Sequence, residues 1–430
     1  MTQSNLAALQ KPDVFESKTI RLSSPIIHIG SEVQQLNPFE YIQTPRRVYL
    51  PNLEALAKAL LERGDLNDYI SCIQGRQSIA ELLEDAFGDD WQLAKDEQGE
   101  PIFPKHCVNR KWPNDRITDL RPMIRNGMGA FYIPGSSIKG AIRTAIAYYL
   151  LKHSNRYNVP RQNRVSAIEQ ILNRRLGGRG LNKYHQKFLD DDLFMNSLFT
   201  DFDLRYQNKP VHSRTGPNTD FMRAIRVSDS APLLEHKVKY KKGKEIPYNI
   251  PVVAEVLVSS RFNQQDAKYR ASIYAEMVRN VRTTFTITLD YEMLSWFRHS
   301  QGMELPFKTL DELLVICQEF AQEQWDFEHD YWNVIKNNPN AKRRNLDFGE
   351  VRQFYEPEIC PYSLRLGWGT GMRGTTVNLR LADELVQAIR DTCGIKAPGF
   401  EAPKSRRTVY DNQGTIKYLP GWAKFREVKQ

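Results

Sequence analysis

The residues best suited to chemistry lie in the segment FYIPGSSIKG, residues 131–140. Ser136 and Ser137 follow a Pro-Gly turn and stand where the pattern predicts the start of a helix. Free backbone N–H groups and the positive end of the helix dipole meet there, which favours an anion. Lys139 and Arg143 are four residues apart and share a helix face, where like charges repel. This arrangement indicates a phosphate-binding site.

Two other interpretations of these residues need to be weighed. The two bases could simply be solvated beside a capped helix. A Walker A loop is excluded, because Ala141 and Ile142 stand where that loop needs lysine and serine or threonine.

A second candidate is the glycine-rich segment LGWGTGMRGT, residues 366–375. It contains G-x-G-x-x-G, but the following TTVNLRL is β-branched and predicts an extended segment, so no helix is available to bind a pyrophosphate. Dinucleotide binding is therefore disfavoured, and no cofactor is predicted. Four glycines in eight residues, with Trp368 and Arg373, suit a loop pressed against a sugar-phosphate backbone, because a Cβ would obstruct the approach. A purely structural tight turn is the alternative.

Candidate catalytic and metal-binding residues are few. Asp190, Asp191 and Asp192 form the densest carboxylate cluster, but FLDDDLF fits a helix boundary with solvated acids better than a two-metal site. The eight histidines form no HxH or HExxH pattern, and His28 stands alone at the end of a predicted strand. We therefore predict neither a metal site nor a catalytic residue.

The charge balance indicates the class of partner. Among 430 residues, 60 Lys and Arg stand against 51 Asp and Glu, which gives a net charge of +9. Residues 152–187 hold nine bases and one acid, whereas residues 54–100 hold 12 acids and four bases. Such a chain suits a polyanionic partner, and nucleic acid is the leading class.

The location follows from cysteines and hydropathy. The five cysteines are scattered and form no C-x-x-C motif, which favours a reducing cytoplasm. No apolar run approaches the length of about 18 residues that a membrane span needs, and the first residues do not form a signal peptide. We expect a cytoplasmic protein with no membrane partner.

The elements that must position these residues alternate between strands and helices without βαβ regularity, which predicts an α+β fold. Strands are expected at residues 18–30, 222–228, 252–258 and 282–289, with a hairpin at 235–248. Helices are expected at residues 53–62, 79–87, 136–151, 309–324 and 383–390. Ser136 or Ser137 is expected to cap the third of these, and residues 91–129 are expected to form a long loop with at most a short strand.

Four segments together carry a resemblance to a known family. They are PIIHIGSE (25–32), FYIPGSSIKGAIRTAI (131–146), RVSDSAP (226–232) and LRLGWGTGMRGTTV (364–377). In this order they resemble the RAMP superfamily of CRISPR RNA-binding proteins. Within it, the chain is most similar to the subunit-five group of type III-A (Csm) complexes, which caps the guide RNA at its 3′ end.

The resemblance implies a ferredoxin-like, RRM-type core with large helical and loop insertions. Residues 1–260 would form the N-terminal RAMP domain, with insertions at 33–130 and 152–215. Residues 261–430 would form a C-terminal α+β region that carries the glycine-rich loop 367–374. The acidic helical segment 53–99 would be part of the first insertion.

The resemblance also implies partners. They are the guide RNA, the other Csm subunits, especially the backbone RAMP subunit, and, indirectly, the target RNA. The chain would support guide maturation in antiviral defence without being an enzyme. The residues expected at the RNA are Ser136, Ser137, Lys139, Arg143, Gly367, Trp368, Gly369, Gly371 and Arg373. The alternative is a RAMP endoribonuclease that processes the guide precursor with a general base such as His28.

Overall fold

The computed structural model describes residues 14–178, 195–210, 217–235, 237–239, 245–263, 265–392 and 396–428. Asp190, Asp191 and Asp192 lie outside these residues, so the structure does not bear on their role. Within the described part, helices and strands mix in an α+β fold, as the sequence predicts.

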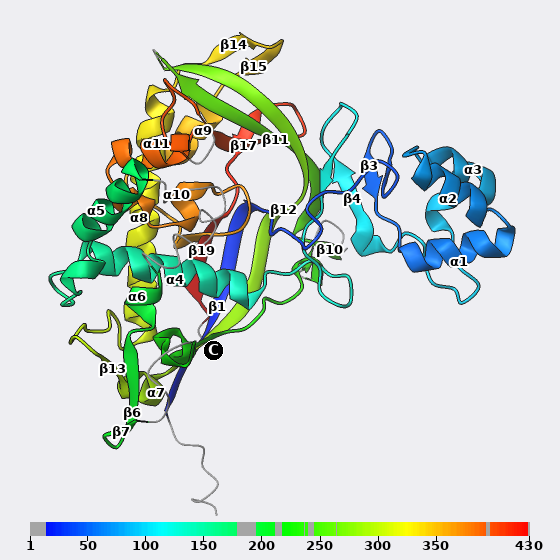
Figure 1. Ribbon diagram of the computed structural model, residues 1–430. Coiled ribbons are helices and arrows are strands. Elements are labelled where there is room, and N and C mark those ends of the chain that lie inside the picture. Colours follow the sequence, from blue (N-terminus) through cyan, green and yellow to red (C-terminus); the bar gives the residue numbers. More distant parts are fainter. Residues whose placement is uncertain are drawn as a thin grey trace, which may run out of the picture.

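A large twisted sheet forms the centre of the molecule (Figure 1). Strand β1 (Phe15–Ile27) lies between β19 (Trp422–Glu427) and β12 (Asp266–Asp290), and β12 pairs in turn with β11 (Ile250–Phe262). All three pairings are antiparallel. Ile20 and Leu22 of β1 are buried while Arg21 between them is partly exposed, as alternation requires. The strand predicted at 18–30 is confirmed over residues 18–27, where β1 ends. The strands predicted at 252–258 and 282–289 are confirmed as parts of the longer β11 and β12.

Short strands extend this sheet at its edges. On the far side of β11 lie β4 (Val108–Lys111), β3 (Arg47–Tyr49) and β2 (Ile42–Gln43), and beyond β19 lies β16 (Leu364–Arg365). The strands off this path are β5 (Leu120–Arg121), β8 (Ile225–Val227), β17 (Arg406–Tyr410) and β18 (Ile416–Tyr418). The segment 91–129 thus contributes two short strands, and only 225–227 of the predicted strand 222–228 is extended, because Phe221–Ala224 forms a 3₁₀ turn.

Two long helices cover one face of the sheet. Helix α4 (Gly135–Lys152) confirms the predicted helix, and its side chains Ile138, Ile142 and Ile146 are fully buried in the main core. Helix α8 (Leu310–Val334) begins with the predicted capping box of Thr309 and Glu312 but continues ten residues beyond the expected end. The rings of Tyr148 and Phe320 join the two helices at a centroid distance of 4.9 Å.

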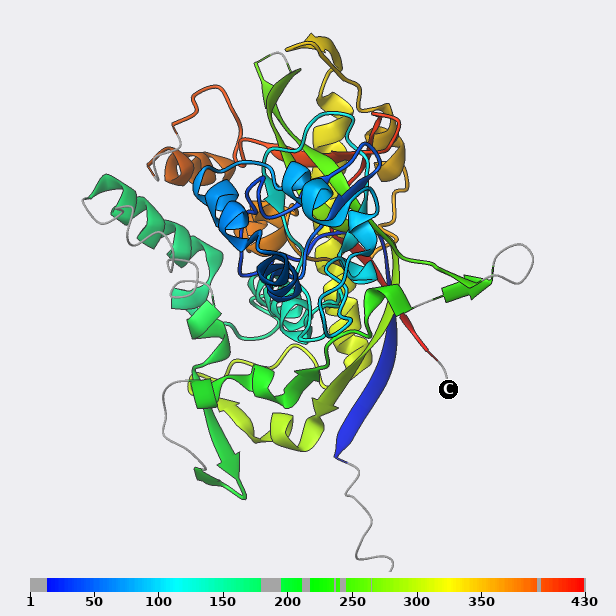
Figure 2. The same cartoon turned by 90° about the vertical axis from the view of Figure 1, so that its right-hand side faces the viewer.

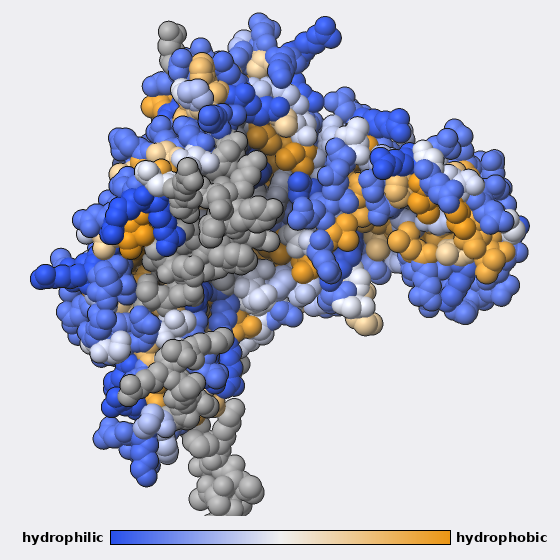
Figure 3. All heavy atoms as spheres, in the orientation of Figure 1, coloured by the Kyte–Doolittle hydropathy of each residue, from blue (hydrophilic) through white to orange (hydrophobic). Residues whose placement is uncertain are grey.

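A helical lobe projects from the edge of the sheet (Figures 1 and 2). It contains α1 (Leu53–Arg63), α2 (Leu66–Gln74) and α3 (Ala80–Phe87) around its own apolar core. Helices α1 and α3 were predicted; α2 was not, although Leu66, Tyr69, Ile70 and Ile73 recur at helical spacing. Figure 3 shows apolar side chains along this lobe, where Leu53, Leu61, Ile70 and Leu93 are exposed.

The other elements surround this framework. Around the start of β1 and on the α4 side lie α5 (Val165–Gly177), α6 (Asn196–Phe199), β6 (Phe202–Tyr206), β7 (Lys209–Pro210), α7 (Tyr291–Trp296) and β13 (Phe297–His299). After α8 come β14 (Asn338–Ala341), β15 (Arg344–Leu346), α9 (Gly349–Tyr355), α10 (Met372–Thr375) and α11 (Asp383–Thr392). The predicted hairpin is confirmed as β9 (Lys237–Lys239) and β10 (Glu245–Pro247).

One local prediction is wrong. The segment 376–381 is not extended: the α10 turn precedes it and Asn378–Arg380 forms a 3₁₀ turn. The hydroxyls of Thr375 and Thr376 donate to carbonyls four residues earlier, which holds the helical turn despite its β-branched residues.

The predicted boundary after residue 260 falls within β11. Both predicted regions supply strands to the same sheet, since β11 pairs with β12 along its length. The division into two regions and the limits of the insertions stay predictions. None of the described helices is long and apolar enough to cross a bilayer.

Candidate nucleic-acid interface

The glycine loop, residues 367–374, is fastened to the end of β1 and to the turn before β19. The backbone N–H of Trp368 donates to the carbonyl of His28 at 2.9 Å, and that of Leu366 donates to the carbonyl of Gly421 at 2.7 Å. A Cβ on Gly367, whose φ is +80°, would come within 2.3 Å of the His28 carbonyl oxygen. Glycine at this position is therefore explained by packing against β1, whereas a Cβ on Gly371 would meet only open space.

Two arginines lie over the ring of Trp368. The guanidinium carbon of Arg121 is 5.2 Å from the ring centroid, and that of Arg407 is 5.0 Å from it. The ring of His28 meets the indole edge-on at 5.2 Å. Three elements far apart in the sequence, β5, β17 and the glycine loop, thus build one aromatic and basic surface patch, which we call the Trp368 patch (Arg121, Trp368 and Arg407).

The two arginines of this patch are not neutralised. Across the residues that the structure describes, neither Arg121 nor Arg407 forms an ion pair with a carboxylate. Burial and, to a smaller extent, the charge of Arg121 lower the pKa of Arg407. Two half-buried cations over one ring, with no paired acid, form a site for an anion.

Further aromatic residues follow the same sheet face. Trp368, Trp112 and Tyr418 pack against a cluster that includes Met277, whereas the next residue, Val278, belongs to the core beneath α4 and α8. Because successive strand residues point to opposite faces, these rings lie on the face that the two helices leave uncovered. Trp112 and Tyr418 stack at 5.8 Å, and Arg279 lies within about 6 Å of both rings.

The start of α4 is occupied by groups of the protein itself. The residue before the helix is Pro134, and Asp229 accepts a hydrogen bond from the backbone N–H of Gly135 at 2.7 Å. The predicted cap by Ser136 or Ser137 is therefore wrong: Ser136 is exposed and Ser137 half-buried. The carboxylate that interacts with the helix end comes from RVSDSAP, so two of the four motifs that carry the resemblance contact each other.

Lys139 and Arg143 also have protein partners. The ammonium of Lys139 donates to the carbonyl of Ile225 at 2.7 Å, and burial lowers its pKa. Arg143 forms an ion pair with Asp220 at 2.5 Å and covers the ring of Phe199. No hydrogen bond or ion pair among the described residues joins these two side chains to the glycine loop. Their contact with RNA stays a prediction.

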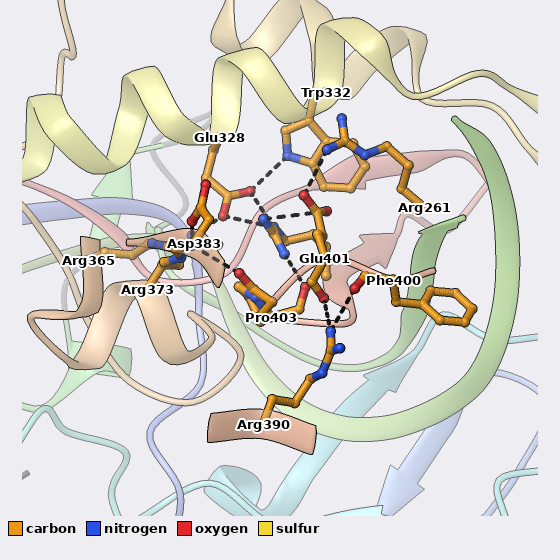
Figure 4. Close-up of polar contacts among 12 residues, drawn as sticks. Arg261, Glu328, Trp332, Arg365, Arg373, Asp383, Arg390, Phe400, Glu401 and Pro403 are labelled. Carbon is orange, nitrogen blue, oxygen red and sulfur yellow. Dashed lines mark hydrogen bonds and ion pairs between the residues drawn. The ribbon is translucent and has the colours of Figure 1, made fainter. Parts of the chain in front are cut away.

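Arg373 is buried beneath the loop. Its guanidinium donates to the carbonyls of Asn378 and Ala402 at 3.1 and 3.0 Å and pairs with Asp383 at 2.6 Å (Figure 4). It thereby ties α10 to the start of α11, and its contact with RNA likewise stays a prediction. The sequence offers one signal for this pair, an acid at the first position of a predicted helix ten residues after the arginine.

His28 is enclosed. It is 1% exposed, and its Nδ1–H donates to the carbonyl of Glu276 at 2.6 Å. Burial lowers the pKa of His28 to about 4, so the ring is neutral at pH 7. A general base must reach the proton it removes, and this ring is covered by Trp368 and the sheet. The described residues also contain no cluster of three or more His, Cys, Asp or Glu that could hold a metal ion.

Comparison with known proteins places this fold in a family. The sequence model described as the RAMP superfamily matches residues 19–395. This chain belongs to the RAMP superfamily. The match covers all four motifs, and the predicted family is confirmed.

Part of this RAMP chain is similar to a protein of a CRISPR system. The chain is 28% identical over 138 residues to the protein Csm5 of a CRISPR system in Enterococcus italicus. That match covers 28% of this chain and 39% of the relative, so it spans about two fifths of the relative's length.

Two solved structures share the fold. One is a chain of a type III-A Csm–crRNA–target RNA ternary complex, with a TM-score of 0.60 and 22% identity over 96% of this chain and 100% of the other. The second is Csm5 of T.onnurineus, with a TM-score of 0.54 and 19% identity over 95% of this chain and 100% of the other. The RAMP chain therefore has a Csm5-like fold.

Proposed function

We propose that this chain is a guide RNA-binding subunit of a type III-A Csm complex that caps the filament at the 3′ end of the guide and supports guide maturation in antiviral defence. The proposed partners are the guide RNA and the other Csm subunits, especially the backbone RAMP subunit, with the target RNA reached indirectly. Support comes from the superfamily match and from the likeness to proteins named Csm5.

We further propose that six elements form a ferredoxin-like core. In chain order they are β1, α4, β11, β12, α8 and β19, a βαββαβ sequence. Their strands lie side by side as β19-β1-β12-β11, so that the fourth strand of the core borders the first and the third borders the second. The uncovered face of such a sheet is where RRM-type domains stack bases on aromatic rings.

The Trp368 patch is the observation that carries this proposal. The two guanidinium groups over this ring have no carboxylate partner among the described residues, so they can hold RNA phosphates without reading the sequence. Gly371 adds an open stretch of backbone beside the patch. Contact of Ser136, Ser137, Lys139, Arg143 and Arg373 with the RNA stays a prediction.

The test removes the two charges of the patch. Arg121→Gln with Arg407→Gln should weaken binding of single-stranded RNA by about tenfold or more at moderate salt, because two phosphate contacts are lost. The matched control, Arg63→Gln with Arg76→Gln, removes the same charge from exposed positions of the helical lobe. Affinity is measured by fluorescence anisotropy, with circular dichroism to verify folding. Equal affinity in the folded patch variant and in the control would refute the proposal.

A further inference from the structure

Exposed aliphatic side chains are concentrated in the helical lobe. Five leucines and isoleucines among the described residues have exposed side chains, and four of them lie in the lobe: Leu53, Leu61, Ile70 and Leu93. The lobe helices and the turn after them span only residues 53–93 of 430. Isolated exposed leucines are ordinary on a monomer, whereas a concentration of them indicates a surface that another molecule covers.

Helix α1 has apolar residues on two of its faces. One face packs into the core of the lobe and consists of Ala55, Leu56, Ala59 and Leu60. Leu53, Ala57 and Leu61 follow one another at four-residue spacing, so they form a second stripe along the helix. Leu53 is 52% exposed and Leu61 is 63% exposed, and Ala57 is partly exposed. A surface helix needs only one apolar face, so the second stripe is available to a partner.

The rest of the lobe surface is acidic. Residues 54–100 hold 12 acids and four bases, a net charge of −8, and ten of the 12 carboxylates are exposed. Among the described residues only one of these ten forms an ion pair, Glu54 with Lys58 at 2.7 Å. Such a surface repels the phosphates of RNA and attracts a basic protein.

The charge of the remaining chain indicates which protein this is. The whole chain carries +9 and residues 54–100 carry −8, so the other residues carry +17. A second RNA-binding subunit on the same RNA is expected to be basic for the same reason. Two basic subunits side by side repel each other, and an acidic lobe between them offsets that repulsion. The lobe also projects from the edge of the sheet (Figures 1 and 2), where a neighbouring subunit can reach it.

We propose that the second stripe of α1 and the lobe carboxylates form a docking surface for the basic face of the neighbouring RAMP subunit in the filament. The partner places apolar side chains against Leu53, Ala57 and Leu61, and lysine or arginine side chains opposite the carboxylates. This inference rests on the proposed function, because the neighbouring subunit belongs to the proposed complex. It assigns the lobe to a protein contact, whereas the Trp368 patch is assigned to RNA.

The first experiment removes the apolar stripe. Leu53→Ser with Leu61→Ser is compared with Val315→Ser with Ile359→Ser, which changes two apolar residues outside the lobe that are 63% and 79% exposed. Each full-length protein is added to a complex assembled from guide RNA and the other subunits of the same system, and its dissociation constant is measured by biolayer interferometry. The lobe variant should bind about tenfold more weakly or worse, through faster dissociation, because its apolar contact is lost. The control should bind like the wild type.

The second experiment removes charge from the lobe. The lobe variant is Glu62→Gln with Glu84→Gln, and the control is Glu356→Gln with Glu358→Gln. All four glutamates are exposed, and none forms an ion pair among the described residues. The lobe variant should associate several-fold more slowly than the control at low salt. The difference should vanish at high salt, because charges at the rim of an interface act mainly on the association rate and are screened by ions.

Thermal unfolding and the RNA affinity of the isolated chain are measured for every variant, and both should match the wild type. A folded stripe variant that joins the complex with wild-type affinity would overturn the docking surface. A folded stripe variant with weaker RNA binding would show that the stripe contacts RNA instead. A wild-type dimer in sedimentation velocity that the stripe variant dissolves would show that a second copy covers the stripe.

The outcomes separate the docking surface from the proposed function. If the wild-type chain binds RNA but joins no such complex, the proposed function fails and the docking surface fails with it. If the wild-type chain joins the complex and both lobe variants join it equally well, only the docking surface fails.

Discussion

At Gly367, one methyl group would decide whether the loop can lie against β1. The added Cβ would meet the His28 carbonyl oxygen at 2.3 Å in a left-handed conformation, whereas at Gly371 only the conformation is unfavourable. We expect Gly367→Ala to lower the free energy of unfolding by about 3 kcal/mol or more, from strain and overpacking together. Gly371→Ala should cost about 1 kcal/mol. Urea unfolding measures the free energy of unfolding of both variants. Equal losses in Gly367→Ala and Gly371→Ala would contradict the packing explanation.

The pair formed by Arg143 and Asp220 leads to a prediction opposite to the one from sequence. The sequence predicts that reversing the charges at positions 139 and 143 leaves the fold intact, because the buried isoleucines of α4 remain. In the structure Arg143→Glu would place two carboxylates together at a partly buried contact. We expect a lowered Tm and a free energy of unfolding that is smaller by about 1–3 kcal/mol. Arg143→Glu with Asp220→Arg should recover only part of this loss, because Asp220 also accepts a hydrogen bond from the Met222 N–H. Full stability of the single variant would show that the pair is dispensable.

These residues show what the sequence could and could not reveal. The apolar stripe of α4 is local, so Ile138, Ile142 and Ile146 could be assigned to the core from their spacing alone. The partners of the charged residues are distant: Asp220 lies 77 positions from Arg143, and no pattern links them. Of the Trp368 patch only Trp368 could be singled out, since it stands in a motif whereas Arg121 and Arg407 do not.

At the scale of elements, predictions succeeded where one local signal dominated. The capping box marked the start of α8, and alternation marked the long strands. The prediction that residues 376–381 are extended failed. Val377 is buried and Arg373 donates to the carbonyl of Asn378, so tertiary packing overrode the preference of β-branched residues for extended structure. Pairing of short edge strands such as β5 with β12 depends on distant residues and could not be foreseen.

The helical lobe leads to a prediction about separable folding. It has its own core, and the chain leaves and returns through β3 and β4, which pair as Arg47 with Arg110 and Tyr49 with Val108. Replacing residues 51–106 by an Asn-Gly turn should join the two strands into a hairpin and leave the large sheet folded. We expect a soluble variant that retains RNA binding. Loss of the near-ultraviolet circular dichroism of the remaining core would show that the lobe supports the sheet.

The whole molecule should bind RNA mainly through charge. With a net charge of +9 and about four phosphates neutralised, log K should fall with log salt at a slope near −3, or about fiftyfold between about 50 and 200 mM. Anisotropy titrations at several salt concentrations, with RNAs of unrelated sequence, measure this slope. An affinity that does not change with salt would contradict backbone recognition.

The pairing of β1 with β19 affects how the protein is made. Ile20 pairs with Glu427 and Leu22 with Phe425, so partners about 400 positions apart in the chain lie side by side in the sheet. At a ribosomal rate of about 5–20 residues per second, β1 waits roughly 20–80 s before β19 emerges. During synthesis its edge is open to other strands, nascent or misplaced. A chain that has not yet added β19 therefore leaves one edge of β1 unpaired.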